Sequence, residues 1–177
     1  MILGLDVSTS ITGATVLNEK GDVVYCVAWD MRNKKYFPSL FDKGQFIKDR
    51  IYEIEDWYHI DAVYIEQSLQ SFRSGFSSAK TLSTLSRFNG IVSWLCYSIF
   101  GLEPEYIAAT SARKKCGITI PKGRKAKQVV IQYVVDNVPD VLIEYTKHGN
   151  PKPECFDKAV SWVVAMAGWL ACHKNKN

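Results

Sequence analysis

The sequence lacks the features of secreted, disulfide-bonded or membrane-spanning proteins. Its five cysteines form an odd set without a C-x-x-C pair, which argues against both a disulfide framework and a zinc site. No basic flank precedes a long apolar run at the N-terminus. The longest apolar stretch, 159–172, is interrupted only by Ser161 and is too short to span a bilayer comfortably. We therefore expect a protein of a reducing compartment such as the cytoplasm, with no membrane association.

Linkers, internal repeats and low-complexity tracts are also missing. The 177 residues include 47% hydrophobic residues, which is ordinary for a globular protein and enough to bury a core. The sequence therefore predicts a single domain over residues 1–177.

Acidic residues are scarce in the second part of the chain. Residues 1–66 carry 7 Lys/Arg and 11 Asp/Glu, whereas residues 67–177 carry 15 and 7, a net charge of +8. Seven cations and no acid fall within residues 111–127, a pattern that favours a polyanionic partner over a merely solvated face. These cations are Arg113, Lys114, Lys115, Lys122, Arg124, Lys125 and Lys127.

The stretch MILGLDVSTSITG, residues 1–13, places one carboxylate in an apolar strand. Asp6 follows Ile2, Leu3 and Leu5, and a buried carboxylate needs a cation or a metal as its partner. The alternative is that Asp6 starts a turn and bonds to the backbone of the following Ser-Thr-Ser segment. Carboxylates at the ends of neighbouring elements would favour the first interpretation.

Hydrophobic spacing predicts an α/β fold. Strands are expected at 2–7, 14–18, 23–29, 62–66 and 106–109, the first three antiparallel and joined by short turns. Helices are expected at 41–58, 79–100, 124–137 and from Pro153 through 171, with Thr110 as a further helix cap. The 79–100 helix is apolar on most of its circumference, which predicts burial on two sides and makes it the candidate surface of a homodimer.

Further carboxylates follow at two places. Glu66 ends the apolar strand AVYIE, and Glu154 and Asp157 lie three residues apart, hence on one face, where the last helix begins. Capping of the helix N-terminus is the simpler explanation of either of these last two residues. Four converging acids would repel one another without cations, and oxygen-only ligands suit Mg²⁺ or Mn²⁺. Two such ions are the known device for attack of water on a phosphodiester.

The loop 67–78 contains Phe72, Arg73 and Phe76. Exposed aromatic rings beside a cation suit contact with nucleic acid, and the alternative is that both rings pack under the loop.

In this order, the strand ILGLD with its hydroxyl-rich turn, the strand ending IEQ, the Lys/Arg-rich segment and the final E-x-x-D helix resemble the RuvC-type Holliday junction resolvases of the RNase H-like superfamily. The resemblance covers nearly the whole chain. It implies an RNase H-like mixed five-stranded sheet flanked by helices. It also implies an endonuclease that resolves four-way or other branched DNA by paired nicks, with two Mg²⁺ ions per active site and Mn²⁺ as a substitute.

The resemblance also assigns roles to residues. Asp6, Glu66 and Asp157 would be metal ligands, with Glu154 as the fourth. Lys127 in KAKQVV would assist at the scissile phosphate, and Lys114 or Lys115 would match a second lysine of the family. The aromatic residue that stacks on bases in the family falls near Leu69, and that role is assigned here to Phe72 or Phe76.

Two other functions fit parts of the sequence. GLDVSTSITGATVLNEKGDVV also resembles the phosphate-binding hairpin of sugar kinases and actin-like ATPases, although no second phosphate hairpin or glycine-rich adenosine loop follows Glu66. A non-catalytic module that binds junctions would share the basic segment but would not need four acids.

Overall fold

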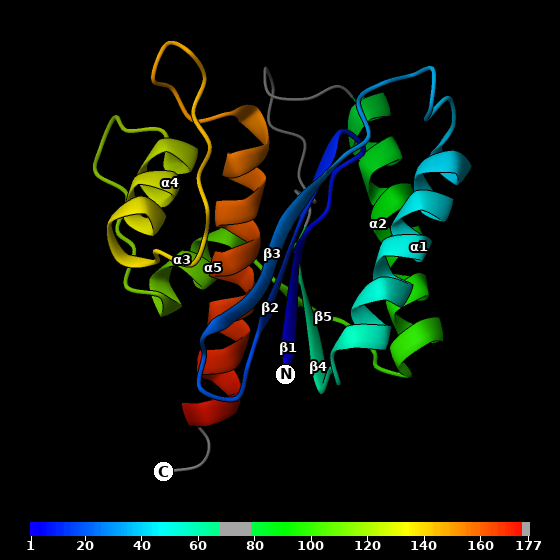
Figure 1. Ribbon diagram of the computed structural model, residues 1–177, viewed down its shortest axis with the longest axis horizontal. Helices are drawn as coiled ribbons and strands as arrows, with labels where there is room; N and C mark the ends of the chain where they lie inside the picture. Colours follow the sequence, from blue (N-terminus) through cyan, green and yellow to red (C-terminus); the bar gives the residue numbers. More distant parts are fainter. Residues whose placement is uncertain (68–78, 175–177) are drawn as a thin grey trace.

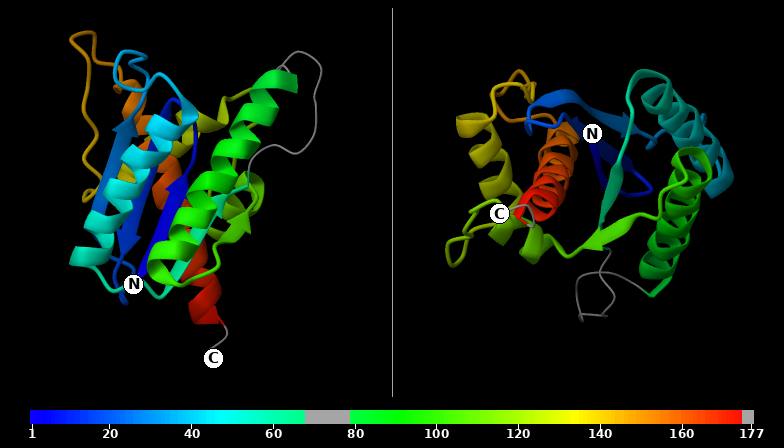
Figure 2. Two further views of the ribbon diagram at one scale, coloured as in Figure 1. Left: turned by 90° about the vertical axis from the view of Figure 1, so that its right-hand side faces the viewer. Right: turned by 90° about the horizontal axis from the view of Figure 1, so that it is seen from below.

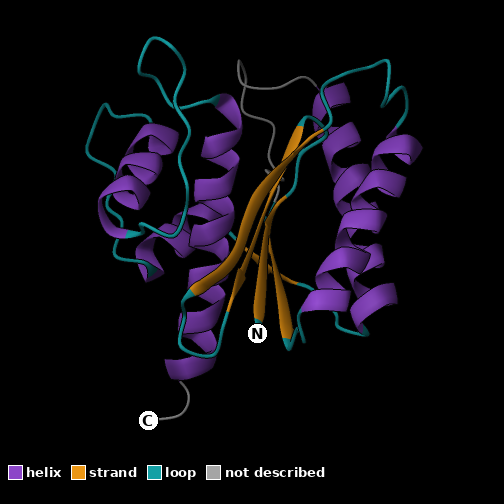
Figure 3. Cartoon of the chain, viewed as in Figure 1, coloured by secondary structure: helices purple, strands orange, loops and turns teal. Residues whose placement is uncertain are grey.

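The chain folds into three layers, with a five-stranded sheet between two layers of helices (Figure 3). The computed structural model describes residues 1–67 and 79–174. The strands are β1 (Ile2–Asp6), β2 (Ile11–Leu17), β3 (Val23–Asp30), β4 (Ala62–Glu66) and β5 (Glu105–Ile107). The helices are α1 (Leu40–Trp57), α2 (Ala79–Phe100), α3 (Ala109–Lys115), α4 (Ala126–Asn137) and α5 (Pro153–Lys174).

The sheet is mixed, in the order β3-β2-β1-β4-β5. The hairpins make β1, β2 and β3 antiparallel, whereas β4 and β5 run parallel to β1. Since β1 and β4 are parallel neighbours with Leu5 opposite Ile65, their carboxyl ends meet at one edge of the sheet. The predicted α/β class and mixed five-stranded sheet are confirmed.

Several predicted boundaries were wrong, among them the start of α4 at Ala126 rather than 124 and the bounds of β5, Glu105–Ile107 rather than 106–109. Two errors have a clear local cause. Strand β2 begins at Ile11, three residues before the predicted start at 14. The turn before it is short because the Ser8 hydroxyl accepts from the Ile11 N–H at 3.0 Å and donates to the Ile11 carbonyl at 2.7 Å. Thr110 is not a cap, since α3 begins at Ala109 and its N-cap residue, Ala108, makes no side-chain hydrogen bond.

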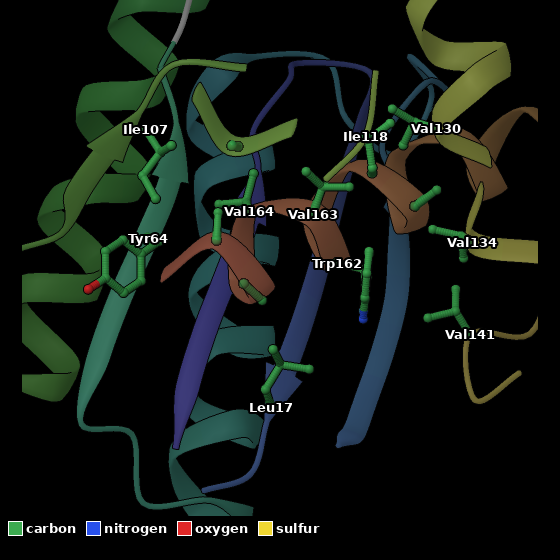
Figure 4. Packing of buried hydrophobic residues seen from close by; sticks show 14 of the residues in the cluster. Leu17, Tyr64, Ile107, Ile118, Val130, Val134, Val141, Trp162, Val163 and Val164 are labelled. Carbon is green, nitrogen blue, oxygen red and sulfur yellow. The ribbon is translucent and has the colours of Figure 1, made fainter. Parts of the chain in front are cut away.

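The helices form two layers, one on each face of the sheet. Helices α1 and α2 cover one face of the sheet, and α5 covers the other with α3 and α4 outside it (Figures 1 and 2). Each face of the sheet has its own hydrophobic core. Figure 4 shows the core on the α5 side, where Trp162, Val163 and Val164 of α5 lie among residues of the sheet and of α4. Among the described residues, α5 is long and apolar enough to cross a membrane, but in this fold it packs against the middle of the sheet.

Strand alternation decides which face each acid occupies. Leu3 and Leu5 of β1 belong to the core under α1 and α2, so the residues between and after them, Gly4 and Asp6, face α5. In β4 the same alternation turns Ile65 to the α1 side and Tyr64 and Glu66 to the α5 side. Both strand-end carboxylates therefore face the helix that carries Glu154 and Asp157.

Glycines let α5 approach the sheet closely. A Cβ at Gly13 would overlap the carbonyl group of Asp157, and one at Gly4 would overlap the backbone of Ala165. Because Gly13 is also the partner of Asp6 across the β1–β2 pair, this approach brings Asp157 toward Asp6.

We expect Gly13→Ala to destabilise the protein by about 1–3 kcal/mol, the usual cost of overpacking, because the obstacle is backbone rather than a flexible side chain. Urea denaturation measures this change. Gly90→Ala in α2 is the control, since a Cβ there meets no atom within 4 Å and alanine favours helix by roughly 0.5–1 kcal/mol. Equal stability of the two variants would contradict this account of the packing.

Candidate active site

Three of the predicted acids interact at the edge of the sheet where β1 and β4 end. Burial raises the pKa of the Asp6 carboxyl well above its ordinary range, and the charges of Glu66 and Asp157 raise it further. Burial likewise raises the pKa of Glu66 and of Asp157. The two carboxyl groups of Asp6 and Asp157 lie close enough to affect each other, and this raises the pKa of Asp6 further.

Two cations oppose this negative charge. The Lys127 ammonium, in the first turn of α4, lies 3.6 Å from Oδ1 of Asp157 and lowers the pKa of all three carboxyls. The Lys127 side chain is 65% exposed, whereas that of Asp157 is 12% exposed. Burial raises the pKa of Glu66 most, and the charge of Arg113 on α3 opposes that rise. The sequence did not predict this influence, and its only signal was that Arg113 is the first cation of the basic segment.

Glu154 contacts Arg32. Its Oε2 is 3.7 Å from Nη2 of Arg32, whose pKa is raised by its bond to Asp30 and further by the charges of Glu154 and Asp157. Arg32 also bonds Asp30 at the end of β3, with Nε 2.9 Å from Oδ1. The sequence analysis did not include Arg32 or Asp30, although a charged pair directly after a strand end was a usable signal.

The donor set fits a hard divalent cation. Asp6, Glu66 and Asp157 supply only oxygen atoms, and burial without enough positive charge disfavours their ionised forms, which a cation would relieve. Within residues 1–67 and 79–174, no three side chains of Asp, Glu, His or Cys form a ready-made coordination shell. An ion held here would complete its shell with water or substrate oxygens, as Mg²⁺ usually does.

The predicted DNA-binding residues fall into two groups. Phe72, Arg73 and Phe76 lie outside the described residues. The others are on α3 or in the connection to α4, where all but the half-buried Arg113 are exposed and no carboxylate of the described chain forms an ion pair with any of them. They are Arg113, Lys114, Lys115, Lys122, Arg124 and Lys125. The basic segment therefore adjoins the carboxylates through Arg113 and Lys127.

Comparison with known proteins gives a structural match without a sequence match. No family model matches the chain, and no curated protein matches it in sequence. RuvC of T. thermophilus in complex with Holliday junction substrate superposes with a TM-score of 0.69 at 13% identity, covering 98% of this chain and 94% of that one. This chain has the RuvC fold.

Two further structures agree. Another structure of Thermus thermophilus RuvC gives a TM-score of 0.64 at 14% identity, with 98% of this chain and 96% of that chain covered. The yeast mitochondrial Holliday junction resolvase Ydc2 gives 0.61 at 11% identity, with 99% and 82% covered. At these identities the RuvC fold is what the comparison establishes, and it confirms the fold that the sequence motifs implied.

We expect Asp6→Asn to stabilise the protein in excess chelator at neutral pH, by on the order of 1 kcal/mol. The folded-state pKa of Asp6 is raised, so the folded state binds more protons than the unfolded state above the ordinary pKa of about 3.9. Stability of the wild type therefore falls as pH rises from that value toward the raised pKa. Asparagine carries no charge and can still donate to Asp157.

Denaturation curves at pH 5 and pH 7.5 measure the effect, with the exposed Asp22→Asn as control. Mg²⁺ should raise the melting temperature of the wild type and raise that of Asp6→Asn much less. An Asp6→Asn protein that is less stable than the wild type in chelator would contradict the electrostatic account of the site.

Proposed function

We propose that this protein is a metal-dependent endonuclease that resolves four-way or other branched DNA junctions. The observation that carries the proposal is the cluster of Asp6, Glu66 and Asp157 beside the cations of α3 and α4. The similar structures are named as Holliday junction resolvases, and one of them is in complex with its junction substrate. Buried acids next to unpaired cations suit a site that cuts a phosphodiester whose backbone is held close by.

Asp6, Glu66 and Asp157, with Glu154 as a fourth ligand, would hold two Mg²⁺ ions, and Mn²⁺ would substitute. When bound, these ions would supply an activated water and neutralise the charge that develops on the phosphate and the leaving oxygen. The expected products are a 5′-phosphate and a 3′-hydroxyl. The carboxylates would set the position of the ions and so of the scissile phosphate.

Lys127 would act directly on the substrate. Its ammonium is exposed and only 3.6 Å from Asp157, so it can move from that carboxylate to a phosphate oxygen without a change of backbone. Once cations neutralise Asp157, the attraction that holds Lys127 there weakens, which frees the amine for the substrate. The exposed cations Lys122, Arg124 and Lys125 would bind flanking phosphates, and affinity should therefore fall steeply with salt.

Paired nicks on a junction call for two copies of the site related by two-fold symmetry. We propose that α2 forms the dimer surface, because Trp94 and Tyr97 are 64% and 58% exposed on it. The five free cysteines are compatible with a reducing compartment such as the cytoplasm.

A panel of labelled four-way junction, flap, duplex and RNA–DNA hybrid substrates, each with Mg²⁺ and with excess chelator, tests the proposed function. We expect cleavage of the junction or flap in Mg²⁺ alone. Cleavage that persists undiminished in chelator would exclude the metal-dependent mechanism. Binding of ATP without binding of branched DNA would instead favour the actin-like alternative.

Asp157→Asn should lower the rate of cleavage by orders of magnitude, because it removes charge from the ligand set while keeping size and packing. Binding of junction DNA, measured in Ca²⁺, should survive or strengthen, since one source of repulsion for phosphate is removed. Asp136→Asn, an exposed change on α4, is the matched control and should cut at the wild-type rate. An Asp157→Asn protein that folds and cuts normally would remove Asp157 from the site.

The dimer predicts a two-fold mass in sedimentation equilibrium at micromolar concentration. Trp94→Glu should convert the protein to a monomer, because it places a charge in an apolar contact. Trp57→Glu changes an equally exposed tryptophan, 61% accessible at the end of α1, and should leave the dimer intact. A wild type that is monomeric at this concentration would contradict the proposal.

A further inference from the structure

Residues 31–43, which are the connection between β3 and α1 (31–39) and the first turn of α1, form a second cationic surface at the same edge of the sheet as Asp6. The Met31 N–H donates to the Ser10 carbonyl at 2.8 Å, and the Lys43 ammonium, one turn into α1, donates to the Thr9 carbonyl. Thr9 and Ser10 belong to the turn that follows β1, so these bonds fix the connection beside the end of that strand. In Figure 1 the connection and the α3–α4 region flank this edge on opposite sides.

The acids around this connection already have partners. Asp30 accepts two hydrogen bonds from the Arg32 guanidinium, and Asp42 completes a capping box with Ser39 at the start of α1. Lys34 and Lys35 are exposed, and neither forms an ion pair with any carboxylate in the described part of the chain. Partial burial lowers the pKa of Lys43, and the charge of Lys34 lowers it further. Positive charge is thus concentrated here without compensation.

Two aromatic rings on the same stretch do not contribute to the core. Tyr36 is 66% exposed and Phe41 is 82% exposed, whereas Phe37 between them packs on Phe46 with ring centroids 5.1 Å apart. The Lys35 ammonium lies over the Tyr36 ring, 5.8 Å from its centroid. Since Phe37 supplies the apolar anchor, the exposed rings have faces free for another planar group.

We propose that this connection binds a single-stranded segment of nucleic acid on the α1 side of the carboxylates, with Lys34 and Lys35 on phosphates and Tyr36 and Phe41 against bases. Cations that follow a backbone, with aromatic side chains beside them, are the chemistry of strand binding without sequence preference. The inference rests on the proposed function in that the strand would be a part of the DNA that the carboxylates cut. It implies that the substrate is held on both sides of the cut, by this connection and by the α3–α4 segment.

Fluorescence anisotropy with a labelled 15-nucleotide oligo-dT in chelator tests the cationic part. Each phosphate neutralised on a single strand contributes about 0.7 to the slope of log affinity against log salt, so Lys34→Ala/Lys35→Ala should reduce that slope by roughly 1.4. Lys20→Ala/Lys48→Ala removes the same charge from the β2–β3 hairpin and the middle of α1, and should leave the slope nearly unchanged.

The aromatic part is tested with Tyr36→Leu and Phe41→Leu, which keep apolar character but remove the ring. Each should weaken binding of the oligonucleotide by about 5- to 100-fold, as for loss of one stacked base, while binding of blunt duplex changes much less. Circular dichroism should be unchanged for all variants, because these side chains are exposed.

Failure of this inference is distinguishable from failure of the proposed function. If the wild type cuts junctions and all four substitutions leave binding of the oligonucleotide at the wild-type level, the connection does not bind the strand, and the nuclease assignment stands. If the wild type cuts no branched DNA but its binding of the oligonucleotide depends on Lys34, Lys35 and the rings, the surface stands and the nuclease assignment falls.

Discussion

The close contact between α5 and the sheet is the constraint on which the candidate site depends. Gly4 and Gly13 carry no side chain toward the helix, so the helix backbone lies where a Cβ would otherwise be. The buried hydroxyls of Thr15 and Ser161 then meet at 2.8 Å, and Ser161 also bonds the Lys158 carbonyl at 2.8 Å. The first turn of α5 is thereby fixed over the ends of β1 and β2.

That contact forces acids together at an electrostatic cost. Asp6 is held by its strand and Asp157 by its helix, and the Lys127 ammonium relieves part of their repulsion. Proteins that keep such clusters usually do so for function, since burying unpaired charge destabilises the fold. A bound divalent cation would relieve the remaining repulsion, so binding of such an ion would stabilise the fold.

Cations surround this cluster in two arrangements. Those next to the acids, Arg113 and Lys127, balance carboxylate charge directly, whereas Lys34 and Lys122 stand further along the two flanks without acidic partners. Arg32 contacts both Asp30 and Glu154, so it connects the end of β3 to the first turn of α5. A polyanion laid across the edge of the sheet would meet unpaired cations first and the carboxylates between them, which suits phosphates that must approach an acidic centre.

The sequence by itself determined the elements and the choice of acids. Apolar residues located α2 and β4 within their observed bounds, because the buried face of α2 repeats at helical spacing and β4 is apolar until its last residue. The ordered motifs identified the fold even though sequence identity to the similar structures is only 11–14%.

Only the tertiary structure decided which of those groups act on each other. The charge of Arg113 on α3 acts on Glu66 at the end of β4, and the contact of Glu154 with Arg32 joins α5 to the residues after β3. No periodicity encodes such distances, because they depend on how closely α5 and its neighbours pack on the sheet. Sequence spacing placed Glu154 and Asp157 on one side of a helix, and the packing then decided their partners, Lys127 for Asp157 and Arg32 for Glu154.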